Sequence, residues 1–559
     1  MTVAIHAYGL LHSFNEAGVL EFADVHVAQR ICALGNEPDE RVALALALAV
    51  RALRAGSVCV DLSDTSAITD ADLRAAVRAS KLLHDPPVLR LYDDRLLYLD
   101  RYWLEEKQVR DDLIALLGSK SAVKVPPLER LFPAGFEEQR EAAEIALSQA
   151  VTVLTGGPGT GKTTTVARLL ALVAEQAELA GTGRPRIALA APTGKAAARL
   201  QEAVAHEVAR LGAADRTRLG ELRAMTLHRL LGSRPDTSSR FRHDRGNRLP
   251  HDVIVVDETS MVSLTMMARL LEAVRPDTRL ILVGDADQLA SVEAGAVLAD
   301  LVDGLSARHD VRVAALRTSH RFGKSIGALA DAIRRGDAQE ALSVLRSGDE
   351  HIEFIEDDDP TERLRSILTP HARQLRREAS LGSVDKALAA LDAHRLLCAH
   401  RRGPVGVHYW NQQVQRWLAE ESGVPPWSEW YAGRPLLVTA NNYGLKVYNG
   451  DTGVVVDGPD GLRAVIAGST GPLDFSPSRL SDVETMHAMT IHKSQGSQAE
   501  EVTVLLPSED SRLLTRELFY TAVTRAKRKV RVVGSEASVR TAIERRALRA
   551  SGLAQRLRE

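Results

Sequence analysis

The feature that most constrains this chain is a glycine-rich segment directly after an apolar run. Residues 151–154 read Val-Thr-Val-Leu, and residues 156–163 read Gly-Gly-Pro-Gly-Thr-Gly-Lys-Thr. This is the Gly-x4-Gly-Lys-Thr spacing of a nucleotide phosphate loop. Its glycines let backbone N–H groups point at phosphate oxygens, and the helical spacing of residues 166–173 would place a helix N-terminus beside them. The segment predicts a nucleoside triphosphate site at the end of a strand.

The residues of this loop have distinct expected roles. Lys162 would place a positive charge near the β- and γ-phosphates, and the Thr163 hydroxyl would bind Mg²⁺. Gln139, in a helical segment at residues 137–147, could contact the edge of adenine, with a solvent-facing glutamine as the competing interpretation. The predicted ATP contacts are Gln139, Gly156, Gly157, Pro158, Gly159, Thr160, Gly161, Lys162, Thr163 and Thr164.

A second apolar run, at residues 253–256, ends in two acids. Asp257 would hold Mg²⁺, and Glu258 would orient and deprotonate the attacking water. Adjacent acids are common, so the pair gains weight from its position at a strand end downstream of the phosphate loop. Because ligands of parallel α/β sheets gather at the carboxyl ends of the strands, both motifs should meet one nucleotide.

Two further apolar runs, at residues 187–190 and 280–283, are also followed at once by polar or glycine-containing motifs. After the later run, Gln288 would contact the γ-phosphate or the attacking water and so report hydrolysis. A plain turn after a strand is the alternative interpretation of that motif. The alternation of such strands with helical segments predicts the α/β class.

Two arginines stand out in the C-terminal half. Arg321 lies in the segment 316–322 and Arg525 in the segment 517–527. Phosphoryl transfer spreads negative charge over the equatorial oxygens, and an arginine finger stabilises that charge. We therefore expect Lys162, Glu258, Gln288, Arg321 and Arg525 to act in catalysis, with the nucleotide between two lobes.

Composition excludes several classes of site. The three cysteines, Cys32, Cys59 and Cys398, are scattered among 559 residues, which argues against a zinc site, an iron–sulfur cluster or a disulfide framework. The net charge of −2 gives no global basic field, but a groove for nucleic acid needs only a local patch. The start does not resemble a signal peptide, and the apolar run at 42–50 is too short to cross a bilayer. We expect a cytoplasmic protein without a membrane partner.

The pattern along the chain divides it into domains. Helical periodicity dominates the first part, and a polar, proline-bearing stretch separates it from the α/β pattern. The predicted order is a small, mostly helical N-terminal domain at 1–115, a linker at 116–133, a first α/β domain at 134–310 and a second α/β domain at 311–559.

Two insertions and one acidic cluster complete this organisation. Residues 232–250 predict an inserted hairpin or loop, and residues 433–481, rich in Gly, Val and turn signals, predict a small antiparallel β-barrel. The paired acids at 93–94 and 105–106 are interpreted as solvated surface charge rather than a nuclease site. We expect no nuclease site in this chain.

The order of these motifs resembles that of superfamily 1 DNA helicases. The phosphate loop, Asp257-Glu258, the Gln288 motif and the two arginines match the nucleotide motifs of that superfamily, and residues 191–197, 226–232 and 490–497 match its DNA motifs. The segments 257–261, 490–497 and 520–527 are similar to the RecD family, the 5′-to-3′ motor subunits of RecBCD enzymes. The resemblance runs from about residue 139 to residue 527, and the N-terminal part matches less specifically.

The resemblance implies a fold and a DNA track. It implies two RecA-like P-loop NTPase motor domains, an N-terminal domain that docks on a partner, a strand-separating pin at 232–250 and an SH3-like barrel at 433–481. Tyr443 or Tyr448 in that barrel could stack on bases, with a core tyrosine as the alternative. Small polar side chains and a lysine suit a grip on phosphates that does not read bases. The implied DNA contacts are Thr193, Lys195 and His228 in the first motor domain. In the second, Thr490, His492, Ser494 and Gln495 would contact DNA or couple ATP to DNA.

The resemblance also implies an activity and partners. It implies an ATP- and Mg²⁺-dependent 5′-to-3′ DNA helicase that acts on single-stranded DNA and duplex ends. The helicase would form a heterotrimer with RecB-like and RecC-like subunits, for double-strand break repair and homologous recombination. DNA cutting would belong to the RecB-like subunit. His320 departs from the family, which often has an aromatic residue there, and this weakens a stacking role at that position.

Two alternatives remain. The first is a stand-alone RecD-like helicase, whose members carry a longer N-terminal region, so that the short one here favours the subunit. The second is a regulatory subunit that binds ATP but hydrolyses it weakly. The intact set of catalytic residues argues against this second alternative.

Overall fold

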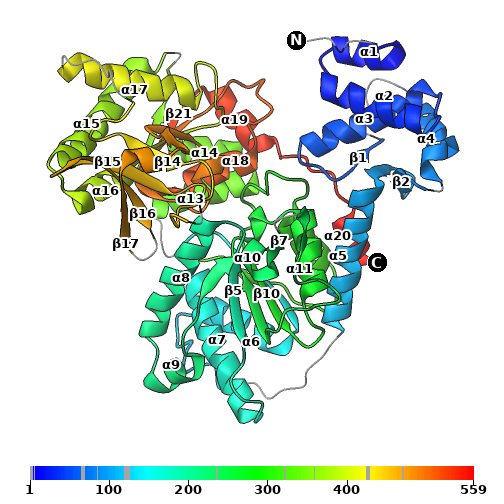
Figure 1. The fold of residues 1–559 in the computed structure, drawn as a ribbon, viewed down its shortest axis with the longest axis horizontal. Helices are drawn as coiled ribbons and strands as arrows, with labels where there is room; N and C mark the ends of the chain where they lie inside the picture. The colour runs from blue at the N-terminus through cyan, green and yellow to red at the C-terminus, as the bar shows by residue number, and fades with distance from the viewer. Residues whose placement is uncertain are drawn as a thin grey trace.

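The computed structural model describes residues 4, 7–63, 70–84, 86–118, 126–234, 237–319, 323–357, 359–422, 429–442, 444–468 and 471–559. Figure 1 shows three masses, with the N-terminal helices at the upper right, one α/β domain below and a second α/β domain at the upper left. In the described part of the chain, no helix is both long and apolar enough for a bilayer crossing.

The first α/β domain is built on a six-stranded parallel sheet with the order β11-β4-β10-β9-β5-β6. This confirms the α/β class and the four strands predicted from apolar runs, whereas the short edge strands β6 and β11 were not predicted. The strands are β4 (Val151–Gly156), β5 (Ile187–Ala191), β6 (Ala224–Thr226), β9 (Val253–Val256), β10 (Arg279–Gly284) and β11 (Ala314–Leu316).

Alternate residues of these strands enter two apolar clusters on the two faces of the sheet. Ile254 and Val256 pack with one set of helices, and Val253 and Val255 with the other. Burial on both faces explains why the strands read as continuous apolar runs. One face is covered by α6 (Glu137–Ser148), α7 (Lys162–Leu179), α8 (Gly194–Ala209) and α9 (Ala213–Leu219), the other by α10 (Leu227–Leu231), α11 (Leu264–Ala273) and α12 (Val297–Ser306).

The second α/β domain has a five-stranded parallel sheet with the order β12-β21-β20-β13-β19. The strands are β12 (Ile352–Ile355), β13 (His394–Cys398), β19 (Ala488–Thr490), β20 (Ala499–Leu505) and β21 (Ala526–Val533). Its helices are α13 (Lys324–Arg335), α14 (Ala338–Leu345), α15 (Thr361–Ser380), α16 (Val384–Ala393), α17 (Val407–Ser422), α18 (Arg516–Val523) and α19 (Glu536–Glu544).

The predicted boundary between the α/β domains at 310/311 is too early. Strand β11 pairs with β4, so residues 314–316 belong to the first sheet. The last helix, α20 (Leu553–Arg558), also lies outside the second domain, since it packs with α12 of the first domain and with α5 (Asp100–Leu117). A three-residue edge strand and a six-residue helix carry too little periodicity to be placed by pattern. The other predicted limits stay predictions.

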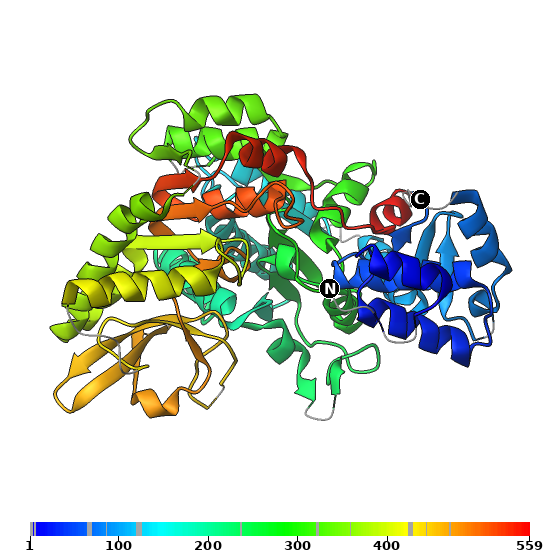
Figure 2. The ribbon, with the colours of Figure 1, turned by 90° about the horizontal axis from the view of Figure 1, so that it is seen from above.

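Both predicted insertions contain antiparallel strands. Within 232–250, β7 (Ser233–Arg234) and β8 (Thr237–Phe241) form a hairpin. The second insertion forms a five-stranded sheet with the order β17-β16-β15-β14-β18, and Figure 2 shows it beneath the second domain. Its strands are β14 (Pro435–Val438), β15 (Thr452–Gly458), β16 (Gly461–Gly468), β17 (Gly471–Phe475) and β18 (Val483–Thr485), the last of which lies beyond the predicted end at 481.

The N-terminal region, residues 9–99, has its own apolar cluster. A hairpin turns at Asp93-Asp94, and both aspartates have positive φ (50° and 51°), as a tight turn with right-handed strand twist requires. The region contains α1 (Gly9–Glu16), α2 (Phe22–Leu34), α3 (Glu40–Arg54), β1 (Val60–Asp61), α4 (Asp70–Ala79), β2 (Leu89–Tyr92) and β3 (Leu96–Leu99).

A buried ion pair fastens the C-terminus to the N-terminal part of the chain. The Arg556 guanidinium lies 3.0 Å from the carboxylate of Glu106 on α5, which is 0% exposed, and 3.9 Å from the ring centroid of Tyr92. The Tyr98 hydroxyl donates to the same carboxylate at 3.0 Å. The interpretation of these acids as solvated surface charge is therefore wrong for Glu106, which is buried with a partner 450 residues away in sequence. It is also wrong for Glu105, which is 5% exposed and accepts from the Thr265 hydroxyl at 2.7 Å.

We expect Arg556→Ala to destabilise the docking of α20. Breaking a buried pair leaves a carboxylate uncompensated, at a cost of about 3–5 kcal/mol. Arg558→Ala is the matched control, because Arg558 lies on the same short helix as Arg556 and pairs with Asp303 of α12, but both side chains of this pair are exposed. Thermal unfolding would measure the loss of stability in each variant, and limited proteolysis of the C-terminus would measure the loss of α20 docking. Equal effects of the two substitutions would contradict a special role for the Glu106–Arg556 pair.

A candidate nucleotide site between the two α/β domains

The phosphate loop joins the end of β4 to the start of α7. Gly159 and Gly161 have φ of 82° and 86°, a left-handed conformation that glycine adopts without strain. The Lys162 ammonium donates to the carbonyl oxygens of Gly156 and Gly157 at 2.6 and 2.9 Å. The loop therefore curls around its own lysine at the N-terminus of α7, the geometry that favours a bound anion.

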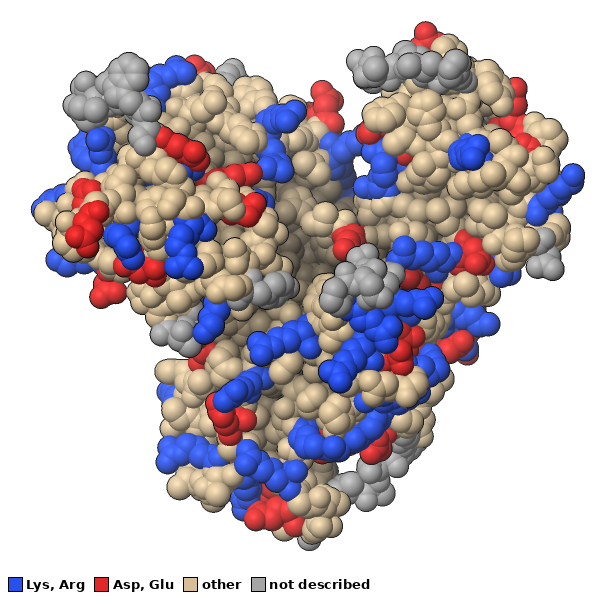
Figure 3. Space-filling view, viewed as in Figure 1, with Lys and Arg blue, Asp and Glu red and all other residues tan. Residues whose placement is uncertain are grey.

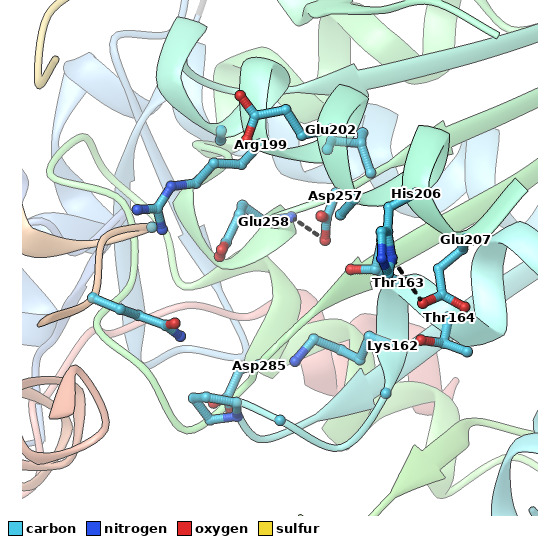
Figure 4. A pocket seen from close by; sticks show the side chains of 18 of the residues that line it. Lys162, Thr163, Thr164, Arg199, Glu202, His206, Glu207, Asp257, Glu258 and Asp285 are labelled. Carbon is cyan, nitrogen blue, oxygen red and sulfur yellow. Dashed lines mark hydrogen bonds and ion pairs between the residues drawn. The ribbon is translucent and has the colours of Figure 1, made fainter. Parts of the chain in front are cut away.

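A cleft of about 950 Å³ opens above this loop, and both α/β domains line it. The first domain contributes Lys162, Thr163, Thr164 and the acids after β9 and β10, as Figure 4 shows. The second domain contributes Gly496, Gln498, Arg525 and Lys527. Of the predicted ATP contacts, Gln139, Pro158, Gly159, Gly161, Lys162, Thr163 and Thr164 line the cleft, while Gly156, Gly157 and Thr160 lie behind them in the loop.

Gln139 supports the loop from behind. Its side chain is buried and donates to the carbonyl oxygen of Thr160 at 3.2 Å. The interpretation as a solvent-facing glutamine is wrong, since α6 brings this residue to the cleft wall. A contact with adenine stays a prediction.

The two acids after β9 differ in their surroundings. Burial and the neighbouring Glu258 raise the pKa of Asp257, while the Glu258 backbone N–H donates to its carboxylate at 2.9 Å. Glu258 itself has φ 51° and ψ 41°, a left-handed conformation that costs free energy for a residue with a side chain. This conformation belongs to the turn that presents the Glu258 carboxylate to the cleft (Figure 4).

The segment after β10 is held by hydrogen bonds from within and from the second domain. The Gln288 amide donates to the buried Asp285 carboxylate at 2.8 Å. The Tyr520 hydroxyl on α18 donates to the same carboxylate at 3.3 Å, and burial raises the pKa of Asp285. The sequence analysis assigned no role to Tyr520, although this residue lies in the segment 517–527 that was singled out for Arg525.

The two predicted arginine fingers have different outcomes. Arg525 is buried at the cleft, its Nε donates to the Thr521 carbonyl oxygen at 2.9 Å, and burial lowers its pKa while Glu258 and Asp285 oppose that change. From its place in the second domain, Arg525 therefore faces the acids of the first domain. Arg321 and its neighbour His320 lie outside the described residues.

The insertion of the second domain covers the first predicted DNA motif. The Lys195 ammonium donates to the Gly450 carbonyl oxygen at 2.8 Å, and burial lowers its pKa to about 7. Gly194 lies against the Tyr448 ring, because a methyl group there would sit 2.4 Å from the ring carbon Cγ. Thr193 caps α8 by accepting from Ala196 N–H at 3.1 Å. Tyr448 thus packs on backbone in this conformation, and Tyr443 lies outside the described residues.

Three other predicted DNA residues lie at accessible places. His228 is exposed on α10, with its ring 5.7 Å from that of Phe241 at the base of the hairpin. Thr490 lies at the end of β19 and lines a groove together with Lys493. His492 is half-buried, and burial lowers its pKa.

Ser494 and Gln495 do not lie where a DNA backbone could reach them. Ser494 is 1% exposed and donates to the Ile491 carbonyl oxygen at 2.7 Å, so the prediction of a DNA contact is wrong for it in this conformation. Gln495 is 8% exposed and donates to the Leu289 carbonyl oxygen at 2.7 Å, across the domain interface. Thr521 accepts from Leu289 N–H at 2.9 Å. Of the two roles expected for Gln495, the geometry fits the coupling of nucleotide to DNA.

We expect Gln495→Ala to slow nucleotide hydrolysis without weakening the binding of single-stranded DNA. The Leu289 carbonyl would lose its buried partner, at a cost of about 1–3 kcal/mol, which corresponds to about a fivefold to hundredfold loss of kcat. Thr490→Ala should show the opposite pattern, with weaker DNA binding. Steady-state hydrolysis and fluorescence anisotropy would measure the two properties, and a large loss of DNA affinity in Gln495→Ala would contradict this assignment.

Three family models match the chain in separate segments. They are described as RecBCD enzyme subunit RecD, N-terminal domain (residues 16–96), AAA domain (residues 139–294) and UvrD-like helicase C-terminal domain (residues 485–533). The AAA match spans the phosphate loop and both acidic motifs. The UvrD-like match includes the segments that carry Gln495 and Arg525.

Curated relatives match along nearly the whole chain. The RecBCD enzyme subunit RecD of Mycobacterium tuberculosis is 73% identical, with 99% of this chain and 98% of the relative covered. That of Mycolicibacterium smegmatis is 70% identical, with 98% and 99% covered. The ATP-dependent RecD2 DNA helicase of Deinococcus radiodurans is 31% identical, with 76% of this chain but 52% of the relative covered. The chain belongs to the RecD family of superfamily 1 and is an ATP-dependent DNA helicase.

Proposed function

We propose that this chain is the 5′-to-3′ motor subunit of a RecBCD-type heterotrimer, and that it hydrolyses ATP between its two α/β domains to move along single-stranded DNA. The observation that carries this proposal is the cleft whose walls come from both domains, with Lys162 on one side and Arg525 on the other. A nucleotide bound there would contact both walls, so that hydrolysis changes the attraction between the domains.

The proposed chemistry assigns a role to each group of the cleft. Lys162 would neutralise the β- and γ-phosphates, Glu258 would take a proton from the attacking water, and Gln288 would orient that water. Arg525 would stabilise the charge that develops on the transferred phosphoryl group, and Arg321 is proposed for the same role from the sequence alone.

Magnesium fits this donor set. The Thr163 hydroxyl and the Asp257 carboxylate both line the cleft and offer the hard oxygen ligands that Mg²⁺ prefers. When bound, the ion would neutralise charge on the phosphate oxygens. Asp257 accepts a backbone N–H at only one of its carboxylate oxygens among the described contacts, so an oxygen remains for the ion or its water.

The proposed DNA track crosses both domains on the hairpin side. Figure 3 shows Lys and Arg side chains gathered on the first domain, and Arg229, Arg234 and Arg242 at the hairpin are exposed. A net charge of −2 therefore coexists with a local basic surface. Thr193, Lys195, His228, Thr490 and His492 would hold the phosphates, the hairpin would act as the pin, and the β14–β18 sheet would act as an SH3-like barrel.

The heterotrimer is favoured over a stand-alone helicase by the relatives and by the surface of the chain. The mycobacterial RecBCD enzyme subunits RecD are 73% and 70% identical to this chain, whereas the RecD2 helicase is 31% identical. Phe22 and Leu34 are large apolar side chains at the two ends of α2, and they are 56% and 67% exposed on the surface of the N-terminal region. We propose that this surface meets a RecC-like subunit, and that the complex acts on broken chromosomal ends in the cytoplasm.

Lys162→Ala tests the motor. We expect ATP hydrolysis stimulated by single-stranded DNA to fall by about a hundredfold or more, because the charge that stabilises the phosphates is lost. Unwinding of a 5′-tailed duplex should be lost with it. Lys386→Ala, an exposed lysine on α16, is the control. Undiminished hydrolysis in Lys162→Ala would contradict the proposal. So would an unchanged protein that unwinds 3′-tailed duplexes and no 5′-tailed ones.

Co-purification tests the partners. We expect two larger chains, identified by mass spectrometry as RecB-like and RecC-like, to accompany the tagged protein from its own cells. Phe22→Asp should reduce their recovery at least about fivefold, because a charge would enter an apolar contact. Leu179→Asp places a charge on a leucine of α7 that is 65% exposed, and it should have no effect. A lone 60.7 kDa species that unwinds 5′-tailed duplexes would favour the stand-alone helicase.

A further inference from the structure

The segment that carries Gln288 is held at both of its ends. It runs from Asp285 to Ala296 between β10 and α12. Near its start, the second domain holds Leu289 through Thr521 and Gln495, as described above. Near its end, Gly295 N–H donates to the Gly56 carbonyl oxygen at 2.9 Å, in the loop between α3 and β1 of the N-terminal region. Three parts of the protein therefore meet on one segment.

A C-terminal strap, residues 545–552, crosses this segment. It leaves α19 of the second domain and ends at α20, which docks on the first domain. Ala547 N–H donates to the Glu517 carboxylate at 2.8 Å on the side of the second domain. On the side of the N-terminal region, Ala550 N–H donates to the Ser57 hydroxyl at 3.1 Å, and Val58 N–H donates to the Ala550 carbonyl oxygen at 3.0 Å.

Arg549 lies in the middle of the strap and points into the junction. One of its terminal nitrogens donates to the carbonyl oxygens of Glu293, at 3.2 Å, and of Ser291. Its guanidinium also lies against Gly56, where a methyl group would come within 2.9 Å of the guanidinium carbon. Gly56 has φ 89°, so both its conformation and its neighbour require glycine.

These contacts place a charged donor on the backbone of the segment that senses the nucleotide. Hydrogen bonds from an ionised donor are stronger than neutral ones. Ser291 is buried, so its carbonyl oxygen would lack a partner if the guanidinium left. Burial lowers the pKa of Arg549 and attraction to Glu517 opposes this change, which agrees with an arginine enclosed between domains.

We propose that Arg549 is a positioning residue for ATP hydrolysis, which holds the Ser291–Glu293 backbone so that Gln288 faces the nucleotide. The inference rests on the proposed role of Gln288 in the cleft. Because the strap is tied to the N-terminal region and to the second domain, the same contact transmits the position of the docking region to the site. A partner bound to the N-terminal region would thereby set the rate of hydrolysis.

The test compares Arg549→Ala with two variants of the full-length chain at saturating single-stranded DNA. In Arg549→Ala we expect kcat for ATP to fall about tenfold or more, with KM and the affinity for a fluorescent ATP analogue within about twofold. Arg549→Lys keeps one charged donor and should recover part of kcat. Arg545→Ala is the matched control on the strap, because the Arg545 guanidinium donates to the carbonyl oxygens of Ser511 and Glu509 of the second domain, at 2.7 and 3.1 Å.

The other possible outcomes would overturn either the positioning role of Arg549 or the proposed function. An unchanged kcat in Arg549→Ala overturns the positioning role, provided that Lys162→Ala is inactive in the same assay. A raised KM with unchanged kcat also overturns it, because Arg549 would then act on nucleotide binding. Equal losses in Arg549→Ala and Arg545→Ala, in step with a lower unfolding temperature, would show general loosening instead. Full activity of Lys162→Ala would remove the proposed function itself.

Discussion

The two α/β domains are joined at the backbone of Leu289. Its N–H and carbonyl are both buried and both paired with side chains of the second domain, Thr521 and Gln495. Unpaired backbone groups are costly inside a protein, so the domains cannot separate here without admitting water or changing partners. Gln288 is the preceding residue, so a displacement of Gln288 acts directly on the contact between the domains.

The ends of parallel strands and the neighbouring second domain together bring residues from distant parts of the sequence into one site. The carboxyl ends of β4, β9 and β10 bring the phosphate loop and the two acidic motifs together, as parallel sheets do in general. The second domain adds Tyr520 from α18 and Arg525 from the turn after it, so a single rotation of α18 would move both Arg525 at the cleft and the partner of Asp285.

The sequence was sufficient for the parts of the site that are local in the chain. The phosphate loop, Asp257-Glu258 and the hairpin at 232–250 each combine a strand with a turn within a few residues, and their periodicity and glycines are readable directly. It was not sufficient for contacts across hundreds of residues. Ser494 and Gln495 sit in a polar motif that looks exposed, yet both are buried, Ser494 against its own domain through Ile491 and Gln495 across the domain interface through Leu289. Glu106 likewise looks solvated until Arg556 is placed against it.

The docking of α20 has a consequence for the order of synthesis. Leu553 and Leu557 are the last large apolar side chains of the chain, and both are fully buried against α12 and α5, which are made hundreds of residues earlier. Domains generally fold as the ribosome delivers them, from the N-terminus onward. The first α/β domain would therefore keep an uncovered apolar groove until residues 553–557 are made, and a chain that stops before Leu553 would leave this early-made domain incomplete.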